Sequence, residues 1–174
     1  MNRSYVIWLT GLPASGKTTL ARHIYRYLVG KGYRVEWLDS DDLRRVLTPN
    51  PKYSEEERDW FYDVLVWIAS LLYRNGVTVI ISATGNKRRY RDKLREMVEN
   101  FIEIYLKCDL EVCIRRDYKG IYEKAFKGLS DTVPGIGSKY EAPLKPELVV
   151  ETDKYGVEES VKRIINFLRR YGFT

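Results

Sequence analysis

The stretch GLPASGKTTL, residues 11–20, directly follows the apolar run YVIWLT, residues 5–10. Four of its residues satisfy the pattern G-x-x-x-x-G-K-[ST]: Gly11, Gly16, Lys17 and Thr18. Glycine lets the backbone turn successive N–H groups toward one point, where they can bind phosphate oxygens, and a helix N-terminus adds its dipole. The pattern therefore predicts a P-loop, with Lys17 on the β- and γ-phosphates of a nucleotide and the Thr18 hydroxyl on Mg²⁺.

A chance match in a glycine-containing turn is the alternative. A true P-loop has a strand immediately before it and a helix immediately after it. Both are indicated here, because residues 5–10 are strand-like and residues 18–29 continue with a helical pattern that ends at Gly30. This context favours the phosphate-binding interpretation.

Length and composition favour one domain over residues 1–174, in the cytoplasm. The chain is 44% hydrophobic, which is enough for a core, and no apolar run approaches the roughly 18 residues that span a membrane. We interpret the N-terminus as a first strand and not as a signal peptide, since it lacks a small-residue cleavage site. Cys108 and Cys113 suggest neither a metal site nor a disulfide framework. The absence of glutamine and the 31% of charged residues are typical of a thermophilic source.

The net charge of +6 admits two kinds of polyanionic partner, nucleic acids and small phosphorylated metabolites. The basic residues are dispersed, and neither an RNA-binding pattern nor a helix-turn-helix is apparent. We therefore expect no nucleic-acid partner and no membrane partner. A small-molecule substrate is the expectation.

Strand-like and helix-like segments alternate along the chain. Five apolar runs rich in β-branched and aromatic residues predict strands at residues 5–10, 34–39, 77–83, 101–107 and 147–152. Helical patterns lie between and after them, at residues 18–29, 43–47, 54–75, 88–100, 110–127 and 157–171. Near-continuous apolar strands separated by helices predict an α/β fold with a five-stranded parallel sheet and helices on both faces.

The predicted helix at residues 54–75 opens with a capping box, formed by Ser54 and Glu57. Five of its apolar residues share one face: Trp60, Val64, Trp67, Ile68 and Leu71. Helical charges ordinarily face solvent, and this is the plain expectation for Arg58, Arg88 and Arg91, with ligand binding as the alternative.

Carboxylates and arginines follow the second predicted strand, in the segment LDSDDLRR, residues 38–45. Ligands bind at the carboxyl ends of strands in such sheets, so this segment should face the P-loop. A carboxylate here, above all Asp41, can accept a proton from an attacking hydroxyl, and Arg44 can hold an acceptor's phosphate. The alternative for the segment is an ordinary helix start with a solvated face, and this is the expectation for Asp42 and Arg45.

A P-loop serves several classes of protein. A GTPase switch would need the base-reading pattern N-K-x-D, but Asn86-Lys87 is followed by two arginines. A motor ATPase would be larger. A small kinase is the natural class at this size, and it needs a closing lid. The long Gly- and Pro-containing stretch at residues 128–146 is a candidate part of that lid.

Five segments carry a resemblance to a known family: GLPASGKTT (11–19), LDSDDLR (38–44), YSEEER (53–58), RRDYKGIYEKAFKG (115–128) and KYEAPLKPELVVET (139–152). On these segments the chain resembles the adenylylsulfate kinases (APS kinases), which phosphorylate the 3′-hydroxyl of adenosine 5′-phosphosulfate (APS) using Mg-ATP. The last two segments are far more specific than a P-loop. The resemblance covers nearly the whole chain and implies the three-layer P-loop nucleotide-kinase fold, usually a homodimer, with a lid around residues 115–143.

The resemblance also implies roles for individual residues. Asp41 would activate the acceptor hydroxyl, and Asp39 would join Thr18 on the Mg²⁺ side. Lys119 would act beside Lys17 and Asp41 in catalysis, and Arg116 would bind ATP from the lid. Residues implied for the P-loop also include Ala14, Ser15 and Thr19. The acceptor would be bound by Arg44, Arg58 and Lys119, with the Tyr53 ring on its adenine.

Three departures from the family pattern lie on the acceptor side. Phe61 stands where the family has Asn, next to Trp60 where it has Glu. Gly85-Asn86 replaces Ser-Pro, and Val133 replaces a Phe whose ring covers the acceptor adenine. The expected activity is phosphorylation of APS to 3′-phosphoadenylyl sulfate in sulfate assimilation. A related kinase acting on another phosphorylated or sugar-containing acceptor is the alternative, and a nucleotide-dependent switch is a third reading.

Overall fold

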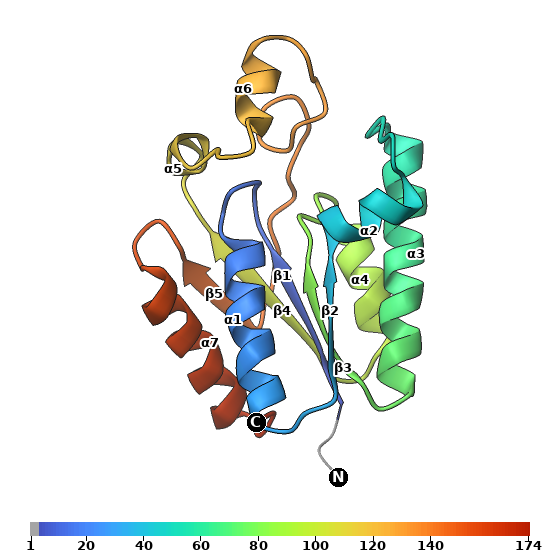
Figure 1. Cartoon of the computed structure of the whole chain (residues 1–174), viewed down its shortest axis with the longest axis vertical. Coiled ribbons are helices and arrows are strands. Elements are labelled where there is room, and N and C mark those ends of the chain that lie inside the picture. Colours follow the sequence, from blue (N-terminus) through green and yellow to red (C-terminus); the bar gives the residue numbers. More distant parts are fainter. Residues whose placement is uncertain (1–3) are drawn as a thin grey trace.

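A parallel sheet of five strands forms the middle layer of the computed structural model, which describes residues 4–174 (Figure 1). Its strands are β1 (Val6–Thr10), β2 (Val35–Asp39), β3 (Thr78–Ser82), β4 (Phe101–Lys107) and β5 (Leu148–Glu151). They lie in the order β2-β3-β1-β4-β5, and every neighbouring pair is parallel. All five predicted strands are confirmed.

Helices cover both faces of the sheet, as predicted. They are α1 (Lys17–Gly30), α2 (Ser40–Leu47), α3 (Glu55–Arg74), α4 (Arg88–Met97), α5 (Leu110–Arg115), α6 (Ile121–Phe126) and α7 (Val157–Arg170). α1 and α7 pack on one face, and α3 and α4 pack on the other (Figure 1). This arrangement confirms the expected α/β fold class.

β1 shows why a central strand of this sheet is apolar at almost every position. Val6 and Trp8 are fully buried in the core beneath α3 and α4, whereas Ile7 and Leu9 are fully buried in the core beneath α1 and α7. Successive side chains of a strand point to opposite faces. A central strand with both faces covered must therefore be apolar at every position.

α3 begins with the predicted capping box, in which the Ser54 Oγ accepts a hydrogen bond from the Glu57 N–H at 3.2 Å. Its sheet-facing side chains, such as Phe61 and Leu65, are fully buried. The apolar residues predicted to share one face include Trp60 and Trp67, which are 49% and 55% exposed. That shared face therefore points away from the sheet, and only Ile68 at its edge packs against the core.

The predicted continuous helix at residues 110–127 is wrong, because α5 and α6 are separate helices. Gly120 between them has a φ of 65°, in the left-handed region that favours glycine. The Asp117 carboxylate accepts hydrogen bonds from the N–H groups of Ile121, Tyr122 and Glu123, so it caps a new helix. Smaller differences occur at α2, which begins at Ser40, and at α4, which ends at Met97.

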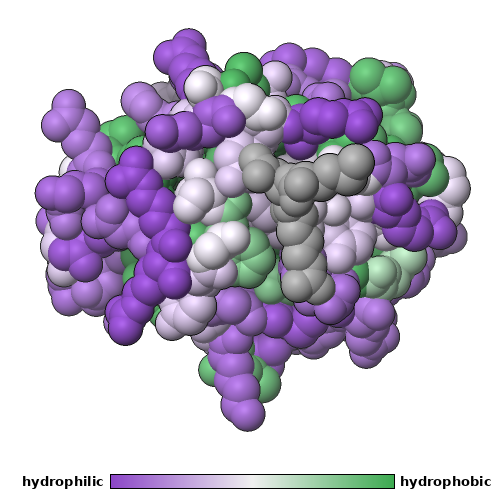
Figure 2. Space-filling view, turned by 90° about the horizontal axis from the view of Figure 1, so that it is seen from below, coloured by the Kyte–Doolittle hydropathy of each residue, from purple (hydrophilic) through white to green (hydrophobic). Residues whose placement is uncertain are grey.

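The two ends of the sheet differ in what surrounds them. α5, α6 and the P-loop lie at the end where the strands finish (Figure 1). At the opposite end hydrophilic side chains predominate and hydrophobic ones are scattered (Figure 2). Within residues 4–174, no helix combines the length and the apolar character that crossing a bilayer requires.

Candidate active site

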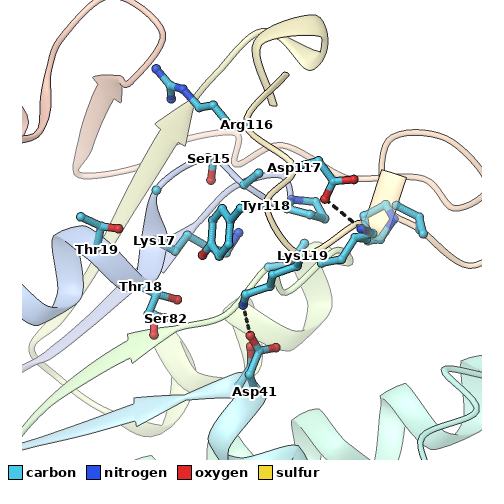
Figure 3. A pocket seen from close by; sticks show the side chains of 18 of the residues that line it. Ser15, Lys17, Thr18, Thr19, Asp41, Ser82, Arg116, Asp117, Tyr118 and Lys119 are labelled. Atoms are coloured by element: carbon cyan, nitrogen blue, oxygen red, sulfur yellow. Dashed lines mark hydrogen bonds and ion pairs between the residues drawn. The ribbon is translucent and has the colours of Figure 1, made fainter. Parts of the chain in front are cut away.

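A cavity of about 690 Å³ lies at the carboxyl ends of the strands, between the P-loop and the segment that carries α5 and α6 (Figure 3). Most of the predicted site residues line it: Ala14, Ser15, Gly16, Lys17, Thr18, Thr19, Asp41, Arg44, Tyr53, Arg58, Arg116 and Lys119. The other two lie just outside its lining. Gly11 packs against Leu106 and Ser15. Asp39 accepts a hydrogen bond from Thr18, which lines the cavity.

The P-loop backbone is shaped to point N–H groups inward. Ala14 and Gly16 have positive φ values of 61° and 98°, and alternation of left- and right-handed residues builds an anion-binding concavity. At Gly11 a Cβ atom would lie 2.7 Å from the Leu106 carbonyl oxygen, so only glycine fits. The buried Ser15 hydroxyl has no hydrogen-bond partner among residues 4–174. These features fit a loop built around a polar, anionic group.

Lys17 is folded back across this loop. Its Nζ donates to the carbonyl oxygens of Gly11 at 3.0 Å and Leu12 at 2.7 Å. Burial lowers the pKa of Lys17 to about 8, although the carboxylates of Asp41 and Asp39 act in the opposite direction. A desolvated ammonium gains most from a neighbouring anion, which suits a group that binds phosphate.

Thr18 and Asp39 provide an oxygen pair beside the phosphate loop. The Thr18 Oγ1 donates to the Asp39 Oδ2 at 3.0 Å, and the Ser82 Oγ donates to the same oxygen at 2.6 Å. The other carboxylate oxygen accepts the Asp41 N–H at 2.9 Å, which caps α2. Hydroxyl and carboxylate oxygens suit Mg²⁺, which keeps waters and substrate phosphates as its remaining ligands. Sequence reasoning missed Ser82, whose place at the end of β3 was the available signal.

Asp41 and Lys119 form an ion pair across the cavity (Figure 3). Asp41 lies in the first turn of α2, and Lys119 lies in the link between α5 and α6. Partial burial lowers the pKa of Lys119, but the hydrogen bond and charge of Asp41 outweigh it and raise that pKa overall. The pair places a carboxylate and a cation near the P-loop lysine.

Arg44 is held between aromatic rings. Its guanidinium carbon lies 3.9 Å from the Phe61 ring centroid and 4.7 Å from that of Tyr53, and the Glu57 carboxylate lies 3.7 Å away. Glu57 also accepts the N–H of Tyr53 at 2.8 Å, which holds this residue at a φ of 55°. Phe61, one of the departures from the family pattern, is fully buried and serves as the platform under Arg44.

Arg58 lines the cavity beside Arg44, so the expectation of a solvated helix face is wrong for it. It is 8% exposed and donates to the carbonyl oxygen of Thr132 and to the Ser138 Oγ. Burial lowers its pKa, with the nearby Arg44 charge contributing in the same direction. Two close guanidinium groups with few anionic partners have the charge and the geometry that suit an acidic ligand.

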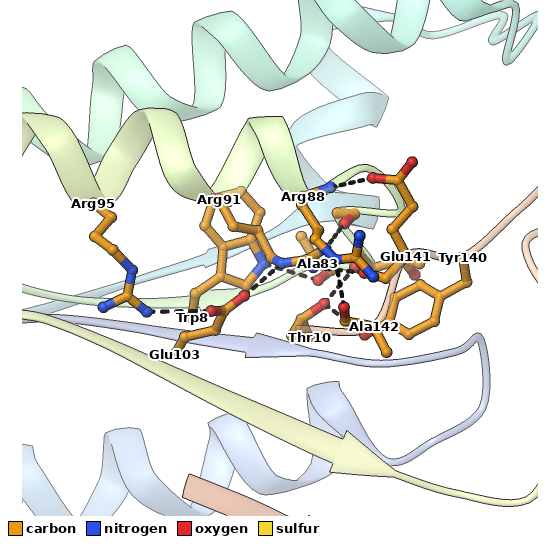
Figure 4. Close-up of polar contacts among 12 residues, drawn as sticks. Trp8, Thr10, Ala83, Arg88, Arg91, Arg95, Glu103, Tyr140, Glu141 and Ala142 are labelled. Atoms are coloured by element: carbon orange, nitrogen blue, oxygen red, sulfur yellow. Dashed lines mark hydrogen bonds and ion pairs between the residues drawn. The ribbon is translucent and has the colours of Figure 1, made fainter. Parts of the chain in front are cut away.

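Arg91 is buried as well, where a solvated face was expected, but it does not line the cavity, and Figure 4 shows its polar contacts. It donates to Glu103 Oε1 at 2.6 Å and to the carbonyl oxygens of Gly85 and Glu141. Arg88, partly buried, donates its Nε to the Ala142 carbonyl oxygen at 2.7 Å. These arginines fasten the segment at residues 138–142 to the loop after β3.

Gly85, Asn86 and Val133 are three further departures from the family pattern, and Asn86 and Val133 line the cavity. Gly85 has a φ of 51°, and a Cβ there would lie 2.9 Å from the Trp8 ring. Asn86 is buried beside Ser138 and Lys139, each within 3.4 Å of its Nδ2. Val133 lines the cavity but is 5% exposed, because it belongs to an apolar cluster with Tyr122 and Cys113.

The far end of the cavity lies between Arg116 and the loop after β5. Arg116 donates to the Thr152 carbonyl oxygen at 2.8 Å, and the Thr152 hydroxyl donates to the Ser15 carbonyl oxygen at 2.9 Å. Tyr155 and Gly156 complete this end. Sequence reasoning missed Thr152 and Tyr155, although both follow the last strand and so belong to the edge where ligands bind.

Comparisons with known proteins give a consistent result. The adenylylsulphate kinase family model matches residues 3–151. A probable adenylyl-sulfate kinase from Archaeoglobus fulgidus is 47% identical over 87% of this chain and 97% of its own length. The adenylyl-sulfate kinase from Halothermothrix orenii is 40% identical over 98% and 92%. The structure of the APS kinase of Mycobacterium tuberculosis in complex with AMPPNP and APS has a TM-score of 0.89 at 31% identity, over 97% and 99%.

Proposed function

Since the chain belongs to the adenylylsulfate kinase family and phosphorylates the 3′-hydroxyl of APS with ATP, we propose a division of its cavity between the two substrates. The P-loop and Lys17 bind the triphosphate of ATP, and its adenosine extends toward Arg116 and Tyr155. Arg44 and Arg58 bind the phosphosulfate of APS. Asp41 and Lys119 lie between the two ends.

One observation carries this division: the cavity that holds the Asp41–Lys119 pair is lined by cations from different elements. Lys17 belongs to the P-loop, whereas Arg44 lies on α2 and Arg58 lies on α3. Among the described residues, two carboxylates line the cavity, those of Asp41 and Asp117. The Asp117 carboxylate already accepts hydrogen bonds from the N–H groups of Ile121 and Tyr122 at the start of α6. Asp41 is therefore the carboxylate placed to take a proton between two anionic substrates.

The reaction then needs one proton transfer and one phosphoryl transfer. The 3′ oxygen of APS loses its proton to Asp41 and forms a bond to the γ-phosphorus of ATP. The bond from that phosphorus to the bridging oxygen breaks, and ADP leaves. Lys17 and Lys119 stabilise the charge that spreads over the transferring oxygens. Thr18 and Asp39 would hold Mg²⁺, which supplies further charge neutralisation at the phosphates.

On the acceptor side the adenine of APS lies against Tyr53. Val133 covers the opposite side with an aliphatic surface, since its side chain lines the cavity without a ring. The α5–α6 segment closes over the substrates as a lid, because it supplies both Lys119 and Arg116. Free, buried Cys108 and Cys113 support a reducing cytoplasmic setting, and the composition supports a thermophilic source.

The experiment that tests the acceptor is a coupled measurement of ADP release from Mg-ATP. APS is compared with no acceptor and with a panel of nucleosides, sugar acids and inositol. We expect ADP release that depends on APS and matches the amount of 3′-phosphoadenylyl sulfate formed. Equal or faster release with a member of the panel would overturn the assignment of the acceptor end.

A further inference from the structure

The main support of the Arg44 guanidinium is the face of an aromatic ring. Its central carbon lies 3.9 Å from the centroid of the Phe61 ring. At this distance the carbon lies over the face of the ring, because contact with the ring edge would keep it farther from the centroid. Arginine stacks on aromatic faces in this way, since the ring face attracts the cation.

The protein leaves most of the N–H donors of Arg44 unused. A guanidinium has five of them. Among residues 4–174, the one hydrogen bond that this guanidinium donates goes to the Thr48 Oγ1, at the long distance of 3.4 Å. The Glu57 carboxylate lies 3.7 Å from the same nitrogen, and its oxygens accept the N–H groups of Lys52 and Tyr53. Arg44 therefore keeps donors free for a ligand in the cavity that it lines.

Phe61 is a fixed support. It is fully buried in the core between the sheet and helices α3 and α4, and its ring packs edge-on against Tyr62 with the centroids 5.4 Å apart. Close packing of this kind holds a core side chain in place. The Tyr53 ring, 4.7 Å from the same carbon of Arg44, is 38% exposed and is not enclosed in this way.

Phe61 does not line the cavity, so it can influence an acceptor only through Arg44. A carboxylate under the guanidinium would occupy its donors and neutralise its charge. A ring face holds the cation and uses none of its donors. On the premise that Arg44 binds the phosphosulfate of APS, we therefore propose that Phe61 is a positioning residue, which fixes the guanidinium edge toward the acceptor.

Arg58 is positioned in a different way. Its guanidinium donates to the Thr132 carbonyl oxygen at 2.5 Å and to the Ser138 Oγ at 3.4 Å. These contacts come from the segment after α6 and do not involve Phe61. A change at Phe61 should therefore alter the contribution of Arg44 to acceptor binding and leave that of Arg58 in place.

The test is the dissociation constant of APS for the full chain with AMPPNP bound, measured by isothermal titration calorimetry. Phe61→Leu keeps an apolar side chain and removes the ring. It should raise this constant about three- to thirtyfold, with kcat and the KM for ATP within about twofold of the wild type. In an Arg44→Ala background the same change should have no further effect. In an Arg58→Ala background it should have its full effect.

Leu65→Ala is the matched control for general loosening of the core. Leu65 lies one turn after Phe61 in the same core and is also fully buried, and it does not line the cavity. This change should lower the melting temperature and leave the dissociation constant of APS within about twofold of the wild type. Phe61→Met, a large apolar side chain without a ring, replaces Phe61→Leu if circular dichroism shows that variant to be unfolded.

Unchanged affinity for APS in Phe61→Leu, beside weakened affinity in Arg44→Ala, would overturn the proposal and leave the division of the cavity intact. An equal effect of Phe61→Leu with and without Arg44 would also overturn it, and so would a similar effect of Leu65→Ala, because the ring would then act as ordinary core packing. Normal affinity in Arg44→Ala would contradict the division of the cavity, and the role of Phe61 with it.

Discussion

Lys119 and Asp41 form an ion pair although 78 residues separate them in the sequence. Lys119 lies in the link between α5 and α6, while Asp41 lies in the first turn of α2, which directly follows the edge strand β2. The contact joins the α5–α6 segment to the acceptor side of the cavity. In the proposed mechanism, this one interaction couples closure of the α5–α6 segment to the position of the Asp41 carboxylate.

Lys17→Ala should abolish phosphoryl transfer and leave the fold intact. The ammonium stabilises charge on the transferring phosphoryl group, and a methyl group cannot replace it. Steady-state turnover should be measured beside thermal unfolding. Near-normal turnover in a folded variant would contradict the role of the P-loop.

The pH dependence of kcat/KM for ATP should report on Lys17. Burial lowers the pKa of this ammonium to about 8, so its charge is lost at a lower pH than usual. At saturating APS, kcat/KM for ATP should therefore fall as the pH rises through about 8. A bound triphosphate stabilises the charged ammonium and raises its pKa, so kcat should begin to fall only at a higher pH than kcat/KM does.

Lys17→Arg is the control for this profile, because a guanidinium stays charged throughout the range. Whatever its absolute activity, this variant should lose the inflection near pH 8. An unchanged inflection would assign it to another group.

Arg44→Ala and Arg58→Ala should each raise the KM for APS and spare the KM for ATP. Each change removes a charge-assisted contact to an anionic acceptor, which costs about 1.5–3 kcal/mol, or roughly 10- to 150-fold. Arg45→Ala is the matched control, since the Arg45 side chain is 78% exposed and pairs with Asp42. Equal losses for both substrates would contradict the division of the cavity.

Tyr53→Ala should raise the KM for APS with little change in kcat. Loss of a stacking ring costs about 1–3 kcal/mol per base. Tyr53→Phe keeps the ring and its contact with Arg44, so it should behave like the wild type. If both variants bind APS normally, the adenine lies elsewhere.

The parts of the molecule that depend on local pattern could be predicted from the sequence. The P-loop and the strands follow from short spacings and apolar runs, and β1 is an example in which every residue is buried. Burial of helical arginines could not be predicted. Arg58 and Arg91 look like surface residues in the sequence, and their partners at Thr132 and Glu141 lie at least 50 residues away.

The break between α5 and α6 was missed although its signals were present. Asp117 caps α6, and Gly120 supplies the left-handed residue before it. The apolar pattern nevertheless continues through α5 and α6, so it predicts a single helix. For α3 the predicted apolar periodicity is correct, but the sequence does not indicate which apolar face of the helix packs against the sheet. A second apolar set that includes Phe61 and Leu65 faces the sheet, and only the packed structure distinguishes the two.

The central claim is that Asp41 takes the proton of the acceptor hydroxyl, and the single-turnover rate of phosphoryl transfer from bound ATP to APS tests it most directly. Asp41→Asn should lower that rate by about 10²- to 10⁴-fold with ATP affinity unchanged, because an amide cannot accept the proton. Asp42→Asn, at the adjacent exposed carboxylate that pairs with Arg45, should keep the wild-type rate. A wild-type single-turnover rate in Asp41→Asn would contradict the account.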